Sequence, residues 1–211
     1  MVKSIFSPLW VLALTAVVLF SHSARSEVKL ESGTIKRIYS SAQLDGVVDF
    51  QLFKDAYLAY EKTTNRSKSL LTIIDYSKPS TEKRFFVIDM DKKSLVFNTY
   101  VSHGVNSGEK TATKFSNIIN SRKTSLGTFL TDSTYYGSNG YSLRLDGLTK
   151  GVNDNARERY IVVHGADYAN ESFLKQNGYL GRSWGCPALP EHLSRQIIDT
   201  IKGGSVIYAS A

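Results

Sequence analysis

The chain has 211 residues, of which 42% are hydrophobic and 21% are charged, and it contains 15 glycines and 4 prolines. These values are typical of a globular domain and exclude a disordered chain, a collagen-like fibre and a multi-span membrane protein. The single cysteine excludes an internal disulfide framework, and the sequence has no Cys/His cluster that would hold zinc.

The first 26 residues have the three-part pattern of a secretory signal peptide. Lys3 provides a basic start, residues 9–20 are an apolar run, and Ala24-Arg25-Ser26 places small residues at positions −3 and −1 of a cleavage site before Glu27. An uncleaved anchor is the alternative, but the run is shorter than the ~20 residues that a membrane-spanning helix needs. We therefore expect an exported protein in the periplasm or cell wall, with no stable membrane span after cleavage.

The charge of the remaining chain is mildly basic. Without the first 26 residues it has 24 Lys+Arg and 19 Asp+Glu, a net charge of +5. Such a charge serves ordinary solubility, or it attracts anionic polymers such as cell wall, membrane surface or nucleic acid. Because no run of basic residues is interleaved with aromatic residues, we expect no nucleic-acid partner.

The hydrophobic pattern predicts short strands with helices near both ends. Residues 27–69 are expected to form an N-terminal arm and a helix, with an apolar helical stripe over 47–62 and Asp45 as its N-cap. Residues 70–211 are expected to form the main domain, with a final helix over 189–202. Strands are expected at 70–76, 84–90, 95–101, 127–131, 141–145, 160–163 and 205–209. The pattern predicts a mainly β (α+β) fold, a sandwich or barrel with appended helices.

The sequence around Cys186 favours a reactive thiol. Gly185 allows the backbone to approach a ligand closely, and the final helical pattern begins shortly after Cys186. A cysteine close to a helix N-terminus has a lowered pKa, because the helix dipole stabilises the thiolate. The alternatives are a buried, inert cysteine and a disulfide to another chain.

Two histidines follow predicted strands and precede a glycine. His164 follows the run at residues 160–163, and His103 follows the run at residues 95–101. A lone histidine is more often a structural hydrogen-bonding group than a catalyst. A histidine at a strand end is nevertheless well placed to act as a general base toward Cys186. Cys–His nucleophilic catalysis is therefore our leading hypothesis.

The combined motifs resemble those of a known family. Val163-His164-Gly165 is followed, 22 positions after the histidine, by Cys186 in Ser183-Trp184-Gly185-Cys186, and residues 125–129 match an upstream glycine motif. On these residues the chain resembles the L,D-transpeptidase catalytic domains of bacterial cell-wall enzymes. The stretches at residues 101–104, 106–108 and 186–188 resemble the murein L,D-transpeptidase branch of that family in particular. The resemblance covers residue 70 to the C-terminus and implies a YkuD-like β-sandwich. Two departures are Trp184, where many relatives have His, and Ala188, where many have Arg.

The resemblance implies a mechanism and a set of site residues. Cys186 would attack a peptidoglycan stem peptide and form a thioester, and an amine of a second stem would then form the cross-link. His164 would be the base, oriented by the Gly165 carbonyl or by Ser183. Substrate contacts are expected from Gly185, Trp184, Arg182 and His103. The resemblance implies neither a metal nor an organic cofactor.

Two alternatives to this function stay open. An L,D-carboxypeptidase or amidase would use the same Cys186 and His164 with water as the acceptor, and a non-catalytic module would bind peptidoglycan without turnover. The long polar stretch at residues 104–124 is expected to be either a lid over the site or a mobile surface loop. The sequence does not indicate the oligomeric state or the acceptor.

Overall fold

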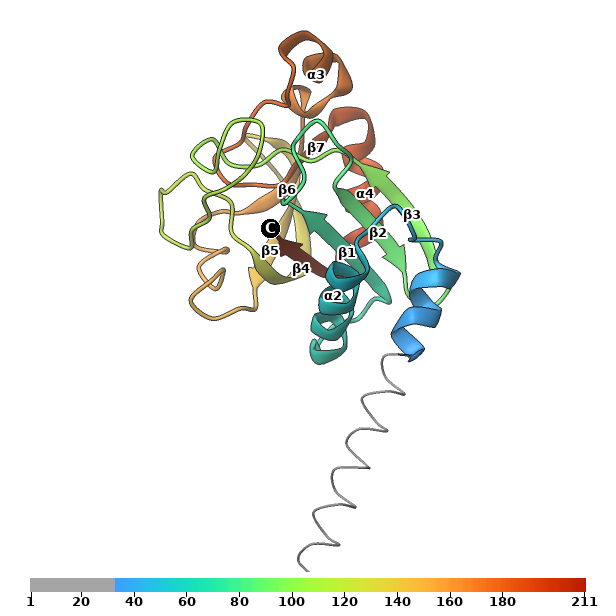
Figure 1. Ribbon diagram of the computed structural model, residues 1–211. Coiled ribbons are helices and arrows are strands. Elements are labelled where there is room, and N and C mark those ends of the chain that lie inside the picture. Colours follow the sequence, from blue (N-terminus) through green and yellow to red (C-terminus); the bar gives the residue numbers. More distant parts are fainter. Residues whose placement is uncertain (1–32) are drawn as a thin grey trace, which may run out of the picture.

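The computed structural model describes residues 33–211 (Figure 1). Residues 33–41 form a first helix. The elements that follow are α2 (Phe50–Lys62), β1 (Leu70–Asp75), β2 (Phe85–Asp89), β3 (Ser94–Thr99), β4 (Gly127–Gly137), β5 (Gly140–Gly147), β6 (Val162–Ala166), the short 3-10 helix η1 (Asp167–Ala169), α3 (Glu171–Asn177), β7 (Ala188–Pro190), α4 (Glu191–Ile201) and β8 (Val206–Ser210). The expected mainly β fold with appended helices is confirmed. The expected signal peptide at residues 1–26 lies outside the described residues.

The strands form one continuous sheet in the order β3-β2-β1-β8-β4-β5-β6-β7. The β1–β8 and β6–β7 pairs are parallel, and the other pairs are antiparallel. The C-terminal strand β8 therefore lies in the middle of the sheet, between β1 and β4 (Figure 1).

The two edges of this sheet meet. Just after β3, the amide of Ser102 donates to the carbonyl of Ala188 in β7 over 2.8 Å. At the next residue, the carbonyl of His103 accepts a hydrogen bond from the amide of Ser183 over 2.9 Å. The sheet thus folds over on itself, and the meeting of its edges places His103 and His164 beside the segment that contains Cys186. The expectation that His164 follows a strand is wrong, because β6 continues to Ala166.

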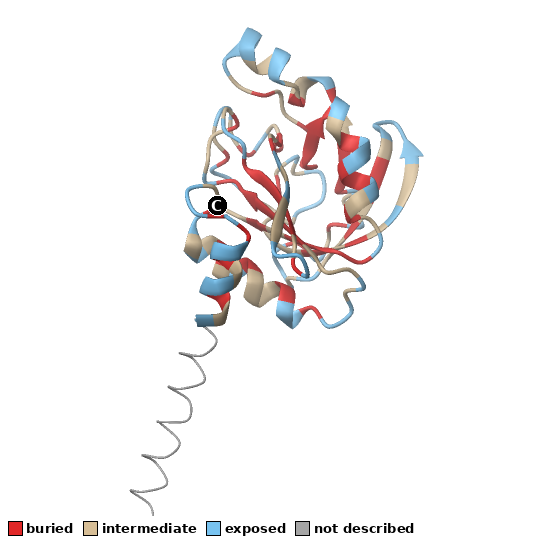
Figure 2. Ribbon diagram, turned by 90° about the vertical axis from the view of Figure 1, so that its right-hand side faces the viewer, coloured by how far each residue is buried: buried red, intermediate tan, exposed pale blue. Residues whose placement is uncertain are grey.

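The central strands are buried on both faces, because their side chains alternate between two apolar clusters. In β1, Ile74 joins the cluster inside the folded sheet, and Leu71 and Ile73 join the cluster under α2. Helix α4 adds Ile197, Ile198 and Ile201 to the inner cluster. Figure 2 shows this burial, with red central strands and pale blue outer surfaces of the helices. The expected division at residue 70 stays a prediction; in the structure the helices before it and the strands after it share one cluster.

Several local expectations differ from the structure. Helix α2 begins at Phe50, and its N-cap is Asp49, whose carboxylate accepts from the amide of Leu52 over 2.9 Å; the expectation of Asp45 as N-cap is wrong, because the residues between Asp45 and Asp49 form turns. The helix at residues 33–41, strand β7 and helix α3 were not expected. No helix within residues 33–211 is long and apolar enough to cross a membrane.

The segment at residues 104–124 is anchored to the rest of the domain. The amide of Gly104 donates to Thr124 Oγ1 over 2.9 Å, and the amide of Thr124 donates to Ser107 Oγ over 2.8 Å. Arg159 donates from outside the segment to the carbonyls of Ser116 and Lys123, both over 2.6 Å. The base of the segment is therefore closed by hydrogen bonds, while Ile118 at its tip is exposed.

Candidate active site

Cys186 lies in the short segment between Ser183, whose amide is hydrogen-bonded to the carbonyl of His103, and the start of strand β7 at Ala188. Its side chain is 8% exposed, and its Sγ donates to the carbonyl of Tyr160 over 3.6 Å. It lines a pocket of about 570 Å³, which we call the Cys186 pocket. The other residues that line it are Asn106, Asn120, Arg122, Asn139, Arg159, Tyr160 and Trp184. Amide and guanidinium groups thus surround the thiol, and such groups bind the amides and carboxylates of peptides.

A tight turn presents the cysteine, and Ser183 holds that turn. The Ser183 hydroxyl donates to the carbonyl of Cys186 over 2.6 Å and accepts from the amide of Gly185 over 3.1 Å. Gly185 has φ +122°, and a Cβ there would lie 2.8 Å from the carbonyl oxygen of Lys123. A side chain at position 185 would therefore strain the backbone and push the 104–124 segment off the turn.

His164 lies in β6, in register with Ala188, two residues after Cys186. Its Nδ1 is 2.9 Å from the carbonyl oxygen of Gly165, and because a carbonyl only accepts, Nδ1 carries the proton. The Nε2 atom then has a free lone pair. Of the two groups expected to orient His164, the Gly165 carbonyl contacts the ring, whereas the Ser183 hydroxyl is hydrogen-bonded to the backbone of Gly185 and Cys186.

The pKa values favour a neutral thiol and a neutral imidazole. Burial raises the pKa of the Cys186 thiol, while a backbone hydrogen bond from Val162 and the charge of Arg159 oppose that rise. Burial lowers the pKa of His164, and its bond to Gly165 opposes that fall. The expected lowering of the Cys186 pKa by a helix N-terminus is wrong, because β7 separates Cys186 from the start of α4 at Glu191. A neutral thiol would need a base in order to act as a nucleophile, and neutral His164 is able to accept a proton.

The residues expected to bind substrate divide into two groups. Trp184 lines the Cys186 pocket and is 71% exposed, with the Arg122 guanidinium 4.2 Å from its ring centroid. Gly185 does not line this pocket and lies in the turn that presents Cys186. Arg182 is instead directed at the Tyr179 ring, 5.7 Å away, and does not line this pocket. His103 is buried at 1% exposure and does not line it either.

Both ring nitrogens of His103 have partners. The buried Arg84 guanidinium donates to Nδ1 over 2.8 Å, so the proton is on Nε2, which donates to the carbonyl of Gly108 over 3.3 Å. Burial, followed by the charge of Arg84, lowers the pKa of His103 to about 4. In this geometry His103 anchors the start of the 104–124 segment; its expected substrate contact stays a prediction.

The sequence reasoning missed most of the polar wall of the Cys186 pocket. Asn106, Asn120 and Asn139 come from turns, Arg122 comes from an irregular stretch, and Arg159 comes from the turns before β6, where hydrophobic periodicity carries no signal. One backbone feature marks this wall: Asn120, Arg122 and Tyr160 all have positive φ, which is uncommon for residues other than glycine. Within residues 33–211, no three His, Cys, Asp or Glu side chains are grouped to hold a metal ion.

Comparison with known proteins identifies the family. The model of the L,D-transpeptidase catalytic domain family (YkuD_2) matches residues 45–210, and the chain therefore belongs to this family. A search of curated proteins gave no match.

Solved structures similar to this chain include three proteins of low sequence identity. An L,D-transpeptidase from Mycobacterium smegmatis is 18% identical over 68% of this chain and 59% of its own, with a TM-score of 0.42. An L,D-transpeptidase (Yku) from Stackebrandtia nassauensis is 13% identical over 84% and 76%, with a TM-score of 0.41. The helical cell shape determining protein Pgp2 from Campylobacter jejuni is 12% identical over 74% and 54%, with a TM-score of 0.44. The chain thus spans 59% of the first of these proteins.

Proposed function

We propose that this protein is a peptidoglycan L,D-transpeptidase in which Cys186 is the nucleophile and His164 the general base. The observation that carries the proposal is the position of Cys186, whose thiol opens on a polar pocket of about 570 Å³ in a domain of the L,D-transpeptidase family. The β6–β7 pair places His164 opposite Ala188, which is two residues after Cys186. The Nε2 atom of His164 supplies an unprotonated nitrogen. The family and the expected signal peptide support a location in the periplasm or cell wall.

Acylation uses the neutral pair described above. As the Cys186 sulfur attacks the carbonyl of the third residue of a stem tetrapeptide, His164 Nε2 accepts the thiol proton. The bond to the terminal D-alanine then breaks, and the imidazolium returns that proton to the departing amine. The carbonyl of Gly165 stabilises the transient positive charge through Nδ1–H. The amide of Cys186 is the candidate donor to the oxyanion, because the amide of Gly185 is already bonded to Ser183.

The second step transfers the acyl group to an amine. The amine of an acceptor stem attacks the thioester, His164 accepts a proton from that amine, and the sulfur leaves as a thiolate that recovers a proton. Water attacking the same thioester would release a tripeptide, which is the carboxypeptidase reaction. The Trp184–Arg122 stack and the anchored 104–124 segment border the pocket and would restrict the entry of water.

The test is incubation of the purified protein with peptidoglycan sacculi, followed by analysis of the released and cross-linked muropeptides. We expect D-alanine release and cross-links between two third residues, both lost in Cys186→Ala and His164→Ala. His192→Ala is the matched control, because His192 is exposed on α4 and should leave the products unchanged. Tripeptide alone, even with excess acceptor, would replace the transpeptidase with the carboxypeptidase, and no product from a folded wild type would leave only a binding module.

A further inference from the structure

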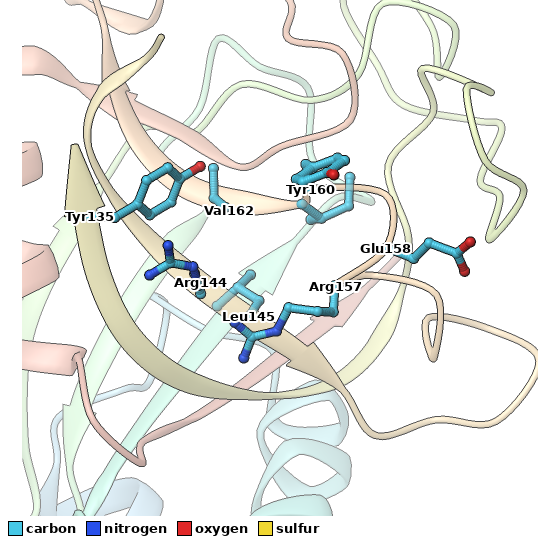
Figure 3. A pocket seen from close by; sticks show the side chains of 8 residues that line it. Tyr135, Arg144, Leu145, Arg157, Glu158, Tyr160 and Val162 are labelled. Atoms are coloured by element: carbon cyan, nitrogen blue, oxygen red, sulfur yellow. The ribbon is translucent and has the colours of Figure 1, made fainter. Parts of the chain in front are cut away.

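A second pocket lies beside the Cys186 pocket and shares a wall with it. It has a volume of about 360 Å³, and its lining includes Tyr135 of β4, Arg144 and Leu145 of β5, Tyr160 in the turn before β6, and Val162 of β6 (Figure 3). We call it the Arg144 pocket. Tyr160 lines both pockets. Its carbonyl accepts from Cys186 Sγ, and Val162 makes the backbone hydrogen bond to the same sulfur. The two pockets are thus separated by the backbone against which the thiol rests.

Arg144 contributes a positive charge that has no carboxylate partner within residues 33–211. Its guanidinium stacks on the Tyr135 ring, 4.1 Å from the centroid, and donates to Ser133 Oγ over 3.2 Å. These contacts leave several of its five N–H donors unused. A planar guanidinium with free donors matches the two oxygens of a carboxylate.

The other charged residues of this pocket do not cancel that charge. Arg157 forms ion pairs with Asp132 over 2.8 Å and with Asp146 over 2.7 Å, so its charge is already compensated. The side chain of Glu158 extends away from the pocket, toward the side opposite Arg144 and Tyr135 (Figure 3). The side chains of Leu145 and Val162 add an apolar floor that suits an aliphatic chain.

Tyr160 divides the two pockets at an energetic cost. It has φ +55°, and its side chain is 81% exposed. The left-handed region is unfavourable for an aromatic residue, and such strain persists only where the surrounding structure imposes it. In this conformation the Tyr160 carbonyl accepts the hydrogen bond from Cys186 Sγ, and the Tyr160 ring lies at the mouths of both pockets.

We propose that the Arg144 pocket binds the carboxylate that neighbours the attacking amine of the acceptor stem. This inference rests on the proposed function and deepens it, because it assigns separate pockets to the donor and to the acceptor. The donor occupies the Cys186 pocket, and the carboxylate of the acceptor pairs with Arg144. The Tyr160 ring between them determines how closely the amine approaches the thioester.

The test measures equilibrium binding by calorimetry in the Cys186→Ala background, where no turnover occurs. The probe is a synthetic stem tripeptide ending in meso-diaminopimelate, whose side-chain amine and carboxylate share one carbon, and the reference probe has that carboxylate amidated. The variants are Arg144→Gln and Arg144→Lys. The control is Arg195→Gln, because Arg195 also stacks on a tyrosine, Tyr141, but lines neither pocket.

We expect the carboxylate probe to bind about tenfold more tightly than the amidated probe. This preference should disappear in Arg144→Gln, be reduced in Arg144→Lys and persist in Arg195→Gln. Equal binding of the two probes, or an unchanged preference in Arg144→Gln, would overturn the inference. If one Arg144 variant does not fold, as judged by thermal unfolding, the other decides. Failure of the transpeptidase proposal would be seen in the sacculus products instead, so the two failures are distinguishable.

Discussion

The two histidines that precede a glycine provide an internal comparison. His103 lies four residues after the end of β3 and His164 lies within β6, and both are almost fully buried, at 1% and 3% exposure. Both rings lie near the place where the edges of the sheet meet. His103 has partners at both nitrogens, Arg84 and Gly108, whereas His164 uses only Nδ1. The difference teaches that catalytic capacity depends on the nitrogen that the fold leaves unbonded, and a His-Gly pair in the sequence does not reveal it.

The largest expected effect is the difference in activity between variants of His164 and of His103. His164→Ala should reduce the rate of D-alanine release from a stem tetrapeptide about 10²–10⁴-fold, because the buried thiol loses its base. The rate is measured with a D-alanine assay, and Cys186→Ala, which lacks the thiol, gives the background. In His103→Ala the loss should be at least tenfold smaller. Equal losses in the two variants would contradict the distinction.

Replacing Arg84, the hydrogen-bond partner of His103, should lower the stability of the protein. Arg84→Met removes the donors to the carbonyls of Lys78 and Val101 and to His103, and each buried acceptor left without a partner is unfavourable. We expect the free energy of unfolding to fall by about 3 kcal/mol, measured by urea titration. Arg195→Met, an exposed control, should change it by less than about 0.5 kcal/mol. An equally small change in Arg84→Met would mean that water replaces its hydrogen bonds.

The pH dependence of stability should report on His103. In the unfolded chain a histidine binds its proton near pH 6.5, but in the folded protein the pKa of His103 is lowered to about 4. The unfolded state therefore binds more protons between these values, and stability should fall as the pH decreases from about 6.5 to about 4. His164, whose pKa is also lowered, contributes in the same direction. Urea titrations at several pH values should give a shallower slope for His103→Gln, and an unchanged slope would assign the effect to other groups.

The glycines after the two histidines should give the smallest difference. A Cβ on Gly104 would lie 2.6 Å from the backbone oxygen of Arg122, whereas a Cβ on Gly165 would lie 2.4 Å from the side-chain oxygen of Ser194. A side chain moves aside more easily than backbone, so Gly104→Ala should destabilise the protein by about 1 kcal/mol more than Gly165→Ala. Urea titration measures both, and the reverse order would show that the 104–124 segment yields more easily than α4.

Much of the fold could be predicted because the central strands are buried on both faces. Continuous apolar runs such as residues 70–76 and 84–90 mark strands whether their side chains point inward or outward. Strand β7 escaped detection because it has only three residues, ends in Pro190 and is defined by its neighbours in the sheet. The helix at residues 33–41 has too little periodicity to be recognised alone and is stabilised by packing on the sheet.

The site could be predicted only in part. Cys186 and His164 lie in sequence motifs, so the sequence was sufficient to bring them forward as candidates. Arg122, Arg159 and Tyr160 act through backbone conformation and long-range contacts, which no spacing encodes. The rise of the Cys186 pKa could not be predicted from the sequence either, because it depends on how completely the folded sheet buries the thiol.

The central position of β8 has a consequence for the order of folding. Residues 206–210 of β8 join β1 to β4, so this link between the two halves of the sheet forms only after β8 has been synthesised. Contacts between strands so distant in sequence form late, because closing such a long loop is entropically unfavourable. His164 and Cys186 belong to one half, while the Ser102 and His103 contacts that close the site belong to the other. The surroundings of Cys186 are therefore completed only when β8 has joined the two halves of the sheet, after all the residues of the candidate site have been synthesised.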